Sequence, residues 1–315
     1  MTGISASWRG RLRRYWLGPW LFAAIALVCP ALLAGQDSEA LARLLSEHWQ
    51  RSQAEQVWFR RDPDAFRLDG ALPGFADEAR QRRHQYNEAV LTQLEGIAPA
   101  QLTAPERISL RVFRYEREAE RAAFSQPDYL FPLTNRSSWQ SYFLNAPENM
   151  SFLSAGDYRR YLDSLADYPR YNTEQLAILE RALARGYTHH CQSMTGFEGS
   201  LRAAVVDDPR DSALYAPFAR MPSTISAAEQ HRLQAEGRRL IGEQVLPAFR
   251  AFADFYQQQY APRCRQAPGI DALDGGAGYY AWAVGFYTTT AMTPRQVHDL
   301  GLEEVARIRA EMDAV

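Results

Sequence analysis

Residues 274–315, DGGAGYYAWAVGFYTTTAMTPRQVHDLGLEEVARIRAEMDAV, carry the strongest local patterns of the chain. The Asp-Gly-Gly start is typical of a turn, because glycine adopts positive φ angles without steric cost. Bulky and small side chains alternate over residues 279–287, which predicts a β-strand with one bulky face and one nearly bare face. The bulky face holds Tyr280, Trp282, Val284 and Phe286. The bare face holds Ala281, Ala283 and Gly285, with Tyr279 and Tyr287 at its ends.

The second half of this stretch predicts a long amphipathic helix. Thr293 is a typical N-cap, Pro294 suits the first helical position, and Gln296 completes a capping box. The pattern is still in phase at residue 315 and no glycine or asparagine cap follows, so we expect a missing C-terminal part. One face of the helix collects Val297, Leu300, Gly301, Val305, Ile308 and Met312.

The composition describes a globular protein with a substantial core. Of the 315 residues, 46% are hydrophobic, and the formal net charge is −2. A nucleic-acid partner usually requires a basic excess, so we expect no nucleic-acid binding. The helical spacing that dominates the rest of the chain predicts a mainly α fold, with one short strand or hairpin near the C-terminus.

Residues 1–35 have the pattern of a signal peptide or an N-terminal membrane anchor. An uncharged stretch follows a basic start, and its most apolar part, residues 20–29, is short for a membrane span. We expect an exported protein, periplasmic or secreted, with inner-membrane anchoring by residues 16–34 as the alternative. The basic start consists of Arg9, Arg11, Arg13 and Arg14.

Three stretches of the chain resemble the bacterial family called domain of unknown function 885. The end of the chain carries TTT followed by TPxxVHxLGLxEVxRIxxEM. Residues 215–222 read YAPFARMP, and residues 157–186 read DYRRYLDSLADYPRYNTEQLAILERALARG. The resemblance implies a multi-helix, zincin-like metallopeptidase scaffold, of which residues 36–315 would be the N-terminal part.

The resemblance also implies zinc, bound in a full-length member by a helix reading H-E-x-x-P-G-H. No histidine of this chain precedes a glutamate, so we expect no catalytic residue, no metal ligand and no cofactor here. Its six histidines are His48, His84, His189, His190, His231 and His298. Adjacent residues on a helix point about 100° apart, so the run His189-His190-Cys191 is not interpreted as a metal site.

Cys191 and Cys264 are the two cysteines beyond the leader. Export permits a disulfide between them, and closing the loop would stabilise the fold by roughly 4 kcal/mol in the chain-entropy model. The alternative is two separate buried thiols, because sequence spacing does not establish proximity.

Further helix starts are predicted along the chain. Thr103 with Glu106 and Ser226 with Glu229 form capping-box patterns. One helix is expected to begin between residues 154 and 157, and another to begin at residue 172 or 173 and end near residue 186. The helix after residue 226 is expected to kink at Pro247.

The predicted strand is the candidate substrate-binding element. A strand with a bare face could bind an extended peptide through its backbone groups, and two tyrosines could add hydrogen bonds. The alternative is a buried hairpin with both tyrosines in the core. The candidate substrate-binding residues are Tyr279, Tyr280, Ala281, Ala283 and Gly285.

Two functions follow from the sequence. The first is the N-terminal part of an exported, zinc-dependent, peptidase-like protein that is inactive without its missing C-terminal part. The second is a non-catalytic helical module that binds a peptide or another protein.

Overall fold

The computed structural model describes residues 20–55 and 72–314, with side chains for residues 35–52 and 72–314. The fold is mainly α, as predicted. Apart from an isolated parallel bridge between His190 and Arg265, the described residues form no strand. No helix within the described ranges is both long enough and apolar enough to cross a membrane. Residues 1–19 of the expected leader lie outside the described residues.

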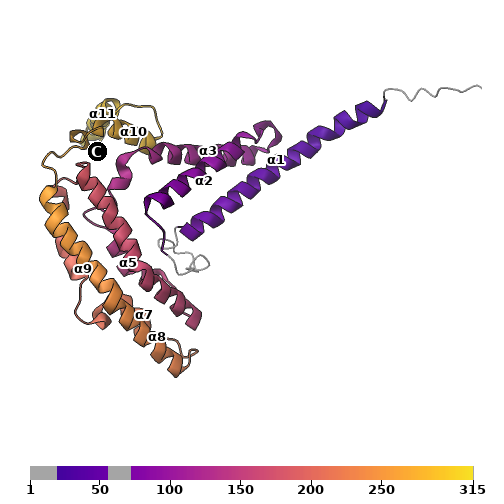
Figure 1. Ribbon diagram of the computed structural model, residues 1–315. Coiled ribbons are helices and arrows are strands. Elements are labelled where there is room, and N and C mark those ends of the chain that lie inside the picture. The colour runs from indigo at the N-terminus through magenta and orange to yellow at the C-terminus, as the bar shows by residue number, and fades with distance from the viewer. Residues whose placement is uncertain (1–19, 56–71, 315) are drawn as a thin grey trace, which may run out of the picture.

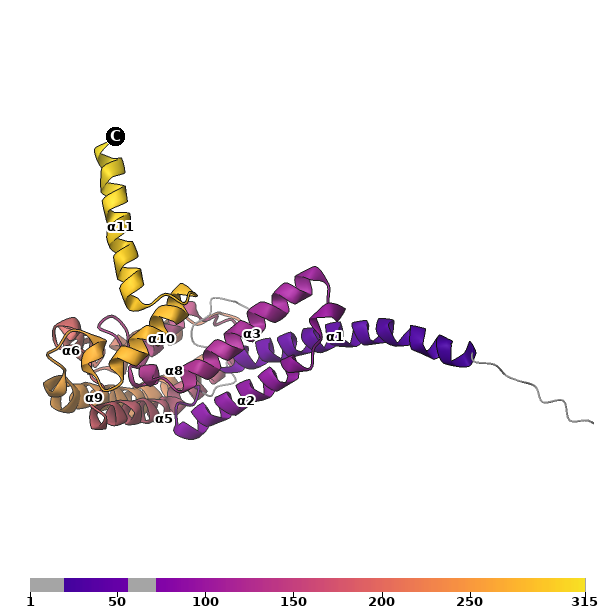
Figure 2. The ribbon, with the colours of Figure 1, turned by 90° about the horizontal axis from the view of Figure 1, so that it is seen from above.

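Three helices form the N-terminal layer, in which α1 (Trp20–Glu55), α2 (Asp77–Glu95) and α3 (Ala104–Phe124) lie side by side (Figures 1 and 2). The predicted capping box at Thr103 begins α3. The layer has its own small core, which is formed by Leu41, Leu44, Val90, Leu94, Ile97, Leu102, Leu110 and Phe113.

The larger core lies around α5 (Ala155–Ala184), which packs along α8 (Ala227–Leu240) and α9 (Leu246–Phe255) (Figure 1). We call these three helices and the core between them the body. The short helices α4 (Trp139–Asn145), α6 (Phe197–Ala203) and α7 (Ala216–Ala219) cover its sides. Trp139 stacks on Phe252, with ring centroids 3.9 Å apart, and its Nε1 donates a 2.8 Å hydrogen bond to Asn172 Oδ1. Aromatic side chains thus help to fill the core of the body, where a large ring buries more apolar area than an aliphatic side chain.

Two prolines behave differently within the long helices. The expected helix boundary near residue 172 is wrong, because α5 continues through Pro169. Buried residues precede and follow this proline along α5, and their packing outweighs the one missing backbone hydrogen bond. Pro247 instead follows a π-helical turn, Ile241–Val245, and such a turn accommodates a proline by relaxing the hydrogen-bond ladder.

The C-terminal segment consists of α10 (Gly276–Thr288) and α11 (Pro294–Asp313), which together we call the arm. Figure 2 shows α11 projecting away from the rest of the molecule. The predicted start of α11 is confirmed, with Thr293 and Gln296 forming a capping box. Ser226 caps α8 by accepting a hydrogen bond from the Glu229 backbone, which confirms the predicted helix start and one half of the predicted capping box.

Candidate functional site

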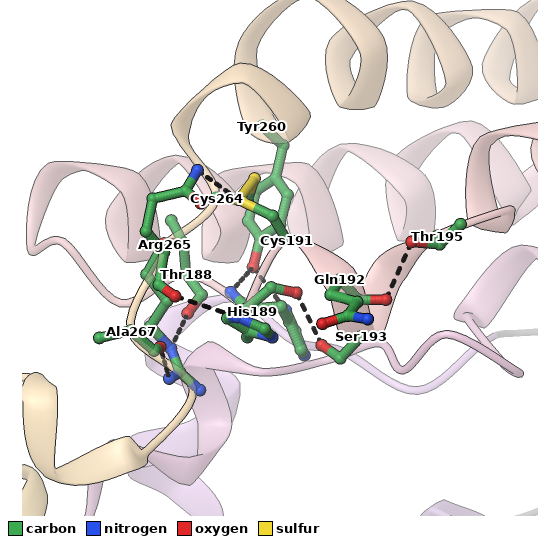
Figure 3. The surroundings of a disulfide bond; sticks show 12 residues. Thr188, His189, Cys191, Gln192, Ser193, Thr195, Tyr260, Cys264, Arg265 and Ala267 are labelled. Atoms are coloured by element: carbon green, nitrogen blue, oxygen red, sulfur yellow. Dashed lines mark hydrogen bonds between the residues drawn. A yellow bond between two sulfur atoms is a disulfide. The ribbon is translucent and has the colours of Figure 1, made fainter.

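The Cys191–Cys264 disulfide and the residues around it, His189, His190 and Arg265, join the body to the segment that leads into the arm (Figure 3). We call this group the disulfide node. Cys191 and Cys264 form a disulfide, with their Cα atoms 5.0 Å apart. Two backbone hydrogen bonds of 3.0 Å run beside it, from Cys191 to the Arg265 carbonyl and from Arg265 to the His189 carbonyl. The covalent link therefore fixes two loops that are 73 residues apart in the sequence.

The Arg265 side chain organises the backbone that precedes α10. Its Nε donates a 2.9 Å hydrogen bond to the Thr188 carbonyl. One terminal nitrogen donates to the carbonyls of Ala267, Pro268 and Gly269, at 2.7–3.0 Å. This nitrogen carries two hydrogens, so the three carbonyls share them, and the positive charge of the guanidinium strengthens the contacts. The sequence analysis missed this residue, because a single arginine in a loop carries no local pattern.

His189 is held neutral at the centre of the node (Figure 3). Its Nδ1 lies 2.7 Å from the Tyr260 hydroxyl, and its ring meets the edge of Phe131 at 5.1 Å. Burial, together with the charge of Arg265, lowers the pKa of His189 to about 4. His190 Nε2 lies 3.1 Å from the Gln266 carbonyl oxygen. Each member of the His189-His190-Cys191 run thus takes part in holding the loops together.

The predicted strand over residues 279–287 is wrong, because these residues lie in the helix α10. The bulky residues also fall at helical spacing, so Tyr279 stacks on Trp282 and Trp282 stacks on Phe286, with centroids 5.7 and 5.3 Å apart. The small residues between them include alanine, which favours a helix. Gly276 allows the close turn at the start, since a β-carbon there would lie 1.8 Å from the Ile270 carbonyl oxygen.

The helical conformation removes the expected mode of substrate binding. Backbone groups within α10 hydrogen-bond inside the helix and cannot pair with an extended peptide. The four candidates of the predicted bare face, Tyr279, Ala281, Ala283 and Gly285, no longer share one face, because successive helical residues are rotated by about 100°. Tyr279 and Ala283 lie on one side, Ala281 and Gly285 on another, and Tyr280 between them.

The two candidate tyrosines have different surroundings. Tyr280 is 51% exposed, and Tyr287, two turns further along the same side of α10, is 81% exposed. Tyr279 is more buried, and burial together with the nearby Asp128 carboxylate raises the pKa of its phenol. The alternative of two core tyrosines is therefore wrong for Tyr280, and Tyr279 faces the segment around Asp128.

The apolar side of α11 is the largest exposed feature of the arm. Five of its large apolar side chains are 45–71% exposed, although they follow helical spacing that normally indicates a buried face. Ion pairs from Arg307 to Glu304 and Glu311 lie at the polar side of the helix. The exposed apolar side chains are Leu300, Leu302, Val305, Ile308 and Met312. We call them the α11 stripe.

Zinc, which the family resemblance implies, does not fit the residues of this chain. No histidine is followed by glutamate. Among the described side chains, residues 35–52 and 72–314, no group of three or more histidine, cysteine or acidic side chains could hold a metal ion. The cysteine ligands that zinc prefers are joined to each other at the disulfide node.

Comparison with known proteins supports a family and a fold. The family model described as bacterial protein of unknown function, domain of unknown function 885, matches residues 58–315. A crystal structure described as that of the putative lipoprotein from Colwellia psychrerythraea is similar, with a TM-score of 0.67 and 15% sequence identity. The similarity covers 90% of this chain and 49% of that one, so this chain spans about half the length of the solved structure. No curated protein matches.

Proposed function

This chain belongs to the bacterial family of domain of unknown function 885, and from that premise we propose that it is the N-terminal scaffold of an exported protein. In this proposal the α11 stripe binds further polypeptide, equivalent to the part of the solved relative that this chain does not span. The observation that carries the proposal is the 20-residue helix α11, whose apolar side faces solvent. A relative about twice as long supplies a natural occupant for that side.

The energy available at this surface is sufficient for a specific contact. Burying the exposed half of five large apolar side chains contributes on the order of 4–8 kcal/mol before the costs of association. Exposed large apolar side chains that gather on one part of a surface often mark an interaction site. The ordered helix start at Thr293 keeps the stripe in one conformation, so little ordering is needed when a partner binds.

Export is the second part of the proposal. The basic and then apolar start of the chain supports it, as does the description of the solved relative as a lipoprotein. The intact disulfide node fits an oxidising compartment such as the periplasm or the cell exterior. Fractionation of cells that express the full chain tests this part, and recovery in the cytoplasm alone contradicts it.

We assign no chemical step to this chain. The family resemblance implies a zinc-dependent peptidase, whose ligands and general base would come from polypeptide carrying H-E-x-x-P-G-H. We expect the purified 315-residue chain to leave a panel of peptides uncut. Hydrolysis that a chelator abolishes would contradict this expectation.

The alternative function is a self-standing binding module, which the large core of the body and the disulfide node favour. Reading the coding DNA beyond codon 315 for an H-E-x-x-P-G-H motif separates the two functions. The motif is expected if the α11 stripe is an internal interface of a longer protein. A stop codon directly after codon 315, with no such motif in the DNA that follows, favours the self-standing binding module.

A pair of double variants tests the stripe directly. Val305→Lys with Ile308→Lys places two charges on the stripe, and Ala310→Lys with Ala314→Lys places the same charges on the opposite side at the end of α11. We expect the unchanged chain to bind a hydrophobic dye and to self-associate at high concentration. The first pair should abolish both properties and the second should keep them. A monodisperse chain that binds no dye would overturn the proposal.

A further inference from the structure

A cavity of about 330 Å³ lies between α2, the 3-10 turn Pro127–Leu130 and α5, away from the α11 stripe. Its size is at the lower end of the range typical of small-molecule sites. A second hollow of about 180 Å³ shares four of its lining residues, which are Arg80, Arg83, Asp128 and Tyr129. These four side chains thus form walls of both hollows.

The cavity has a cationic lining. Arg80, Arg83 and Arg181 contribute three guanidinium groups, against the single carboxylate of Asp128. Arginine binds carboxylate groups through paired hydrogen bonds, and a cation-lined concave site attracts small anions. Arg80 and Arg83 lie in α2, and Arg181 lies in α5, about 100 residues later in the sequence. No local sequence motif therefore contains all three.

The guanidinium groups are fixed in place before any ligand arrives. Arg80 lies between the rings of Phe124 and Tyr129, 4.0 and 4.1 Å from their centroids. Arg83 donates a 2.8 Å hydrogen bond to the Gly74 carbonyl. Such positioning lowers the entropic cost of binding.

Arg181 retains an unused donor. Its two terminal nitrogens pair with the carboxylate oxygens of Asp77, at 3.2 and 3.3 Å. Its Nε is buried and makes no hydrogen bond to any described residue. Because this Nε has almost no accessible surface, a ligand in the cavity would instead bind the remaining N–H groups of the two terminal nitrogens.

The other walls define the rest of the ligand. Phe75, Phe131 and Ile178 form an apolar side. Phe131 also makes an edge-on ring contact with His189, so this side of the cavity packs against the disulfide node. Asp128 offers an acceptor beside the arginines, suited to an N–H group next to the ligand's carboxylate.

We propose that this cavity binds an N-acylated amino acid with an apolar side chain. The arginines hold its carboxylate, Asp128 accepts its amide N–H, and the apolar side of the cavity contacts its side chain. The same chemistry occurs in a free acyl amino acid and at the C-terminus of a peptide. The proposal concerns a different surface from the α11 stripe, and either can fail without the other.

Calorimetric titration of the full chain with N-acetyl-phenylalanine tests the proposal, with N-acetyl-phenylalaninamide as the neutral match. We expect the acid to bind with a Kd of about 1 mM or tighter, which is ordinary for a ligand of this size. The amide should bind at least about tenfold more weakly, because it cannot accept charge-assisted hydrogen bonds. Equal binding of acid and amide, or no saturable binding of the acid, would overturn the proposal.

Two substitutions locate the binding. Arg181→Gln and, separately, Arg83→Gln should each weaken binding of the acid by about tenfold or more. Arg239→Gln is the matched control, because Arg239 is ion-paired on the surface of α8 outside the cavity. Unchanged affinity in both cavity variants, with unchanged melting temperatures, would exclude this cavity as the site.

A short peptide ending in phenylalanine with a free carboxylate separates the two sources of the ligand. Affinity equal to that of N-acetyl-phenylalanine assigns the cavity to peptide C-termini. Binding of the small acid alone assigns it to free acyl amino acids, since a longer chain would then clash at the cavity mouth.

Discussion

Helices of the body and of the arm have the same local features, a capping box and apolar residues at helical spacing, but they differ in how far their side chains are buried. In α5, twelve residues are buried, whereas α11 has a complete capping box and no buried residue. Both helices carry apolar residues at helical spacing. Capping and helix propensity therefore decide where a helix forms, whereas burial of its apolar side depends on a partner of matching shape.

The largest expected effect is on the free energy of unfolding, when one large apolar side chain is truncated in the body and another in the arm. Phe252 is fully buried against Trp139, so Phe252→Ala should lower the free energy of unfolding by about 3–5 kcal/mol. Ile308→Ala on α11 should change it by less than about 0.5 kcal/mol, because Ile308 packs on little. Urea unfolding measures both. Similar losses in the two variants would mean that α11 is docked in solution.

The disulfide node is the link between the two regions, and its removal should have the next largest effect. Replacing Cys191 and Cys264 by serine should destabilise the chain by about 2–4 kcal/mol. Hydrogen exchange should accelerate in residues 265–288 more than in α5, because the node fixes the loop that leads into α10. Uniform acceleration throughout the chain would show instead that body and arm unfold together.

Acid should weaken the node through His189. Its pKa is about 4 in the folded chain against an ordinary value of 6.5, so the unfolded chain binds more protons between these values. Stability should therefore fall as the pH drops from about 6.5 to 4, by at most about 3 kcal/mol for this group. His48, whose pKa burial also lowers to about 4, adds to the same trend in the N-terminal layer.

Two variants assign the acid effect. His189→Gln should reduce the slope of unfolding free energy against pH, and His231→Gln, at an exposed position of α8, should leave it unchanged. Thermal melts at several pH values give both slopes. An unchanged slope in His189→Gln would assign the acid sensitivity to other groups.

The smallest expected effect concerns the start of the arm. Gly276→Ala should cost about 1–3 kcal/mol, because the added carbon meets the Ile270 carbonyl and must displace the backbone. Gly278→Ala, two residues along the same helix, meets nothing within 4 Å and should stabilise α10 by about 0.5–1 kcal/mol. Denaturant melts measure both changes in the free energy of unfolding. Changes of opposite sign would confirm that α10 packs against the turn Ile270–Ala272, and equal changes would contradict it.

Sequence reasoning succeeded for the helix starts at Thr103, Ser226 and Thr293. Each depends on hydrogen bonds between residues no more than three positions apart. It failed for residues 279–287, because the same order of bulky and small residues satisfies both a strand and a helix with stacked aromatics. The expected binding mode failed with it, since a peptide-binding strand edge requires the strand, and substrate binding by these residues stays a prediction.

The sequence by itself determined the mainly α class, the caps and the apolar side of α11, because these depend on neighbours along the chain. The tertiary structure alone decided that α5 runs through Pro169 and that Cys191 meets Cys264. It also brought the arginines of α2 and α5 around one cavity. These features depend on contacts between residues from tens to a hundred positions apart, which no local pattern encodes.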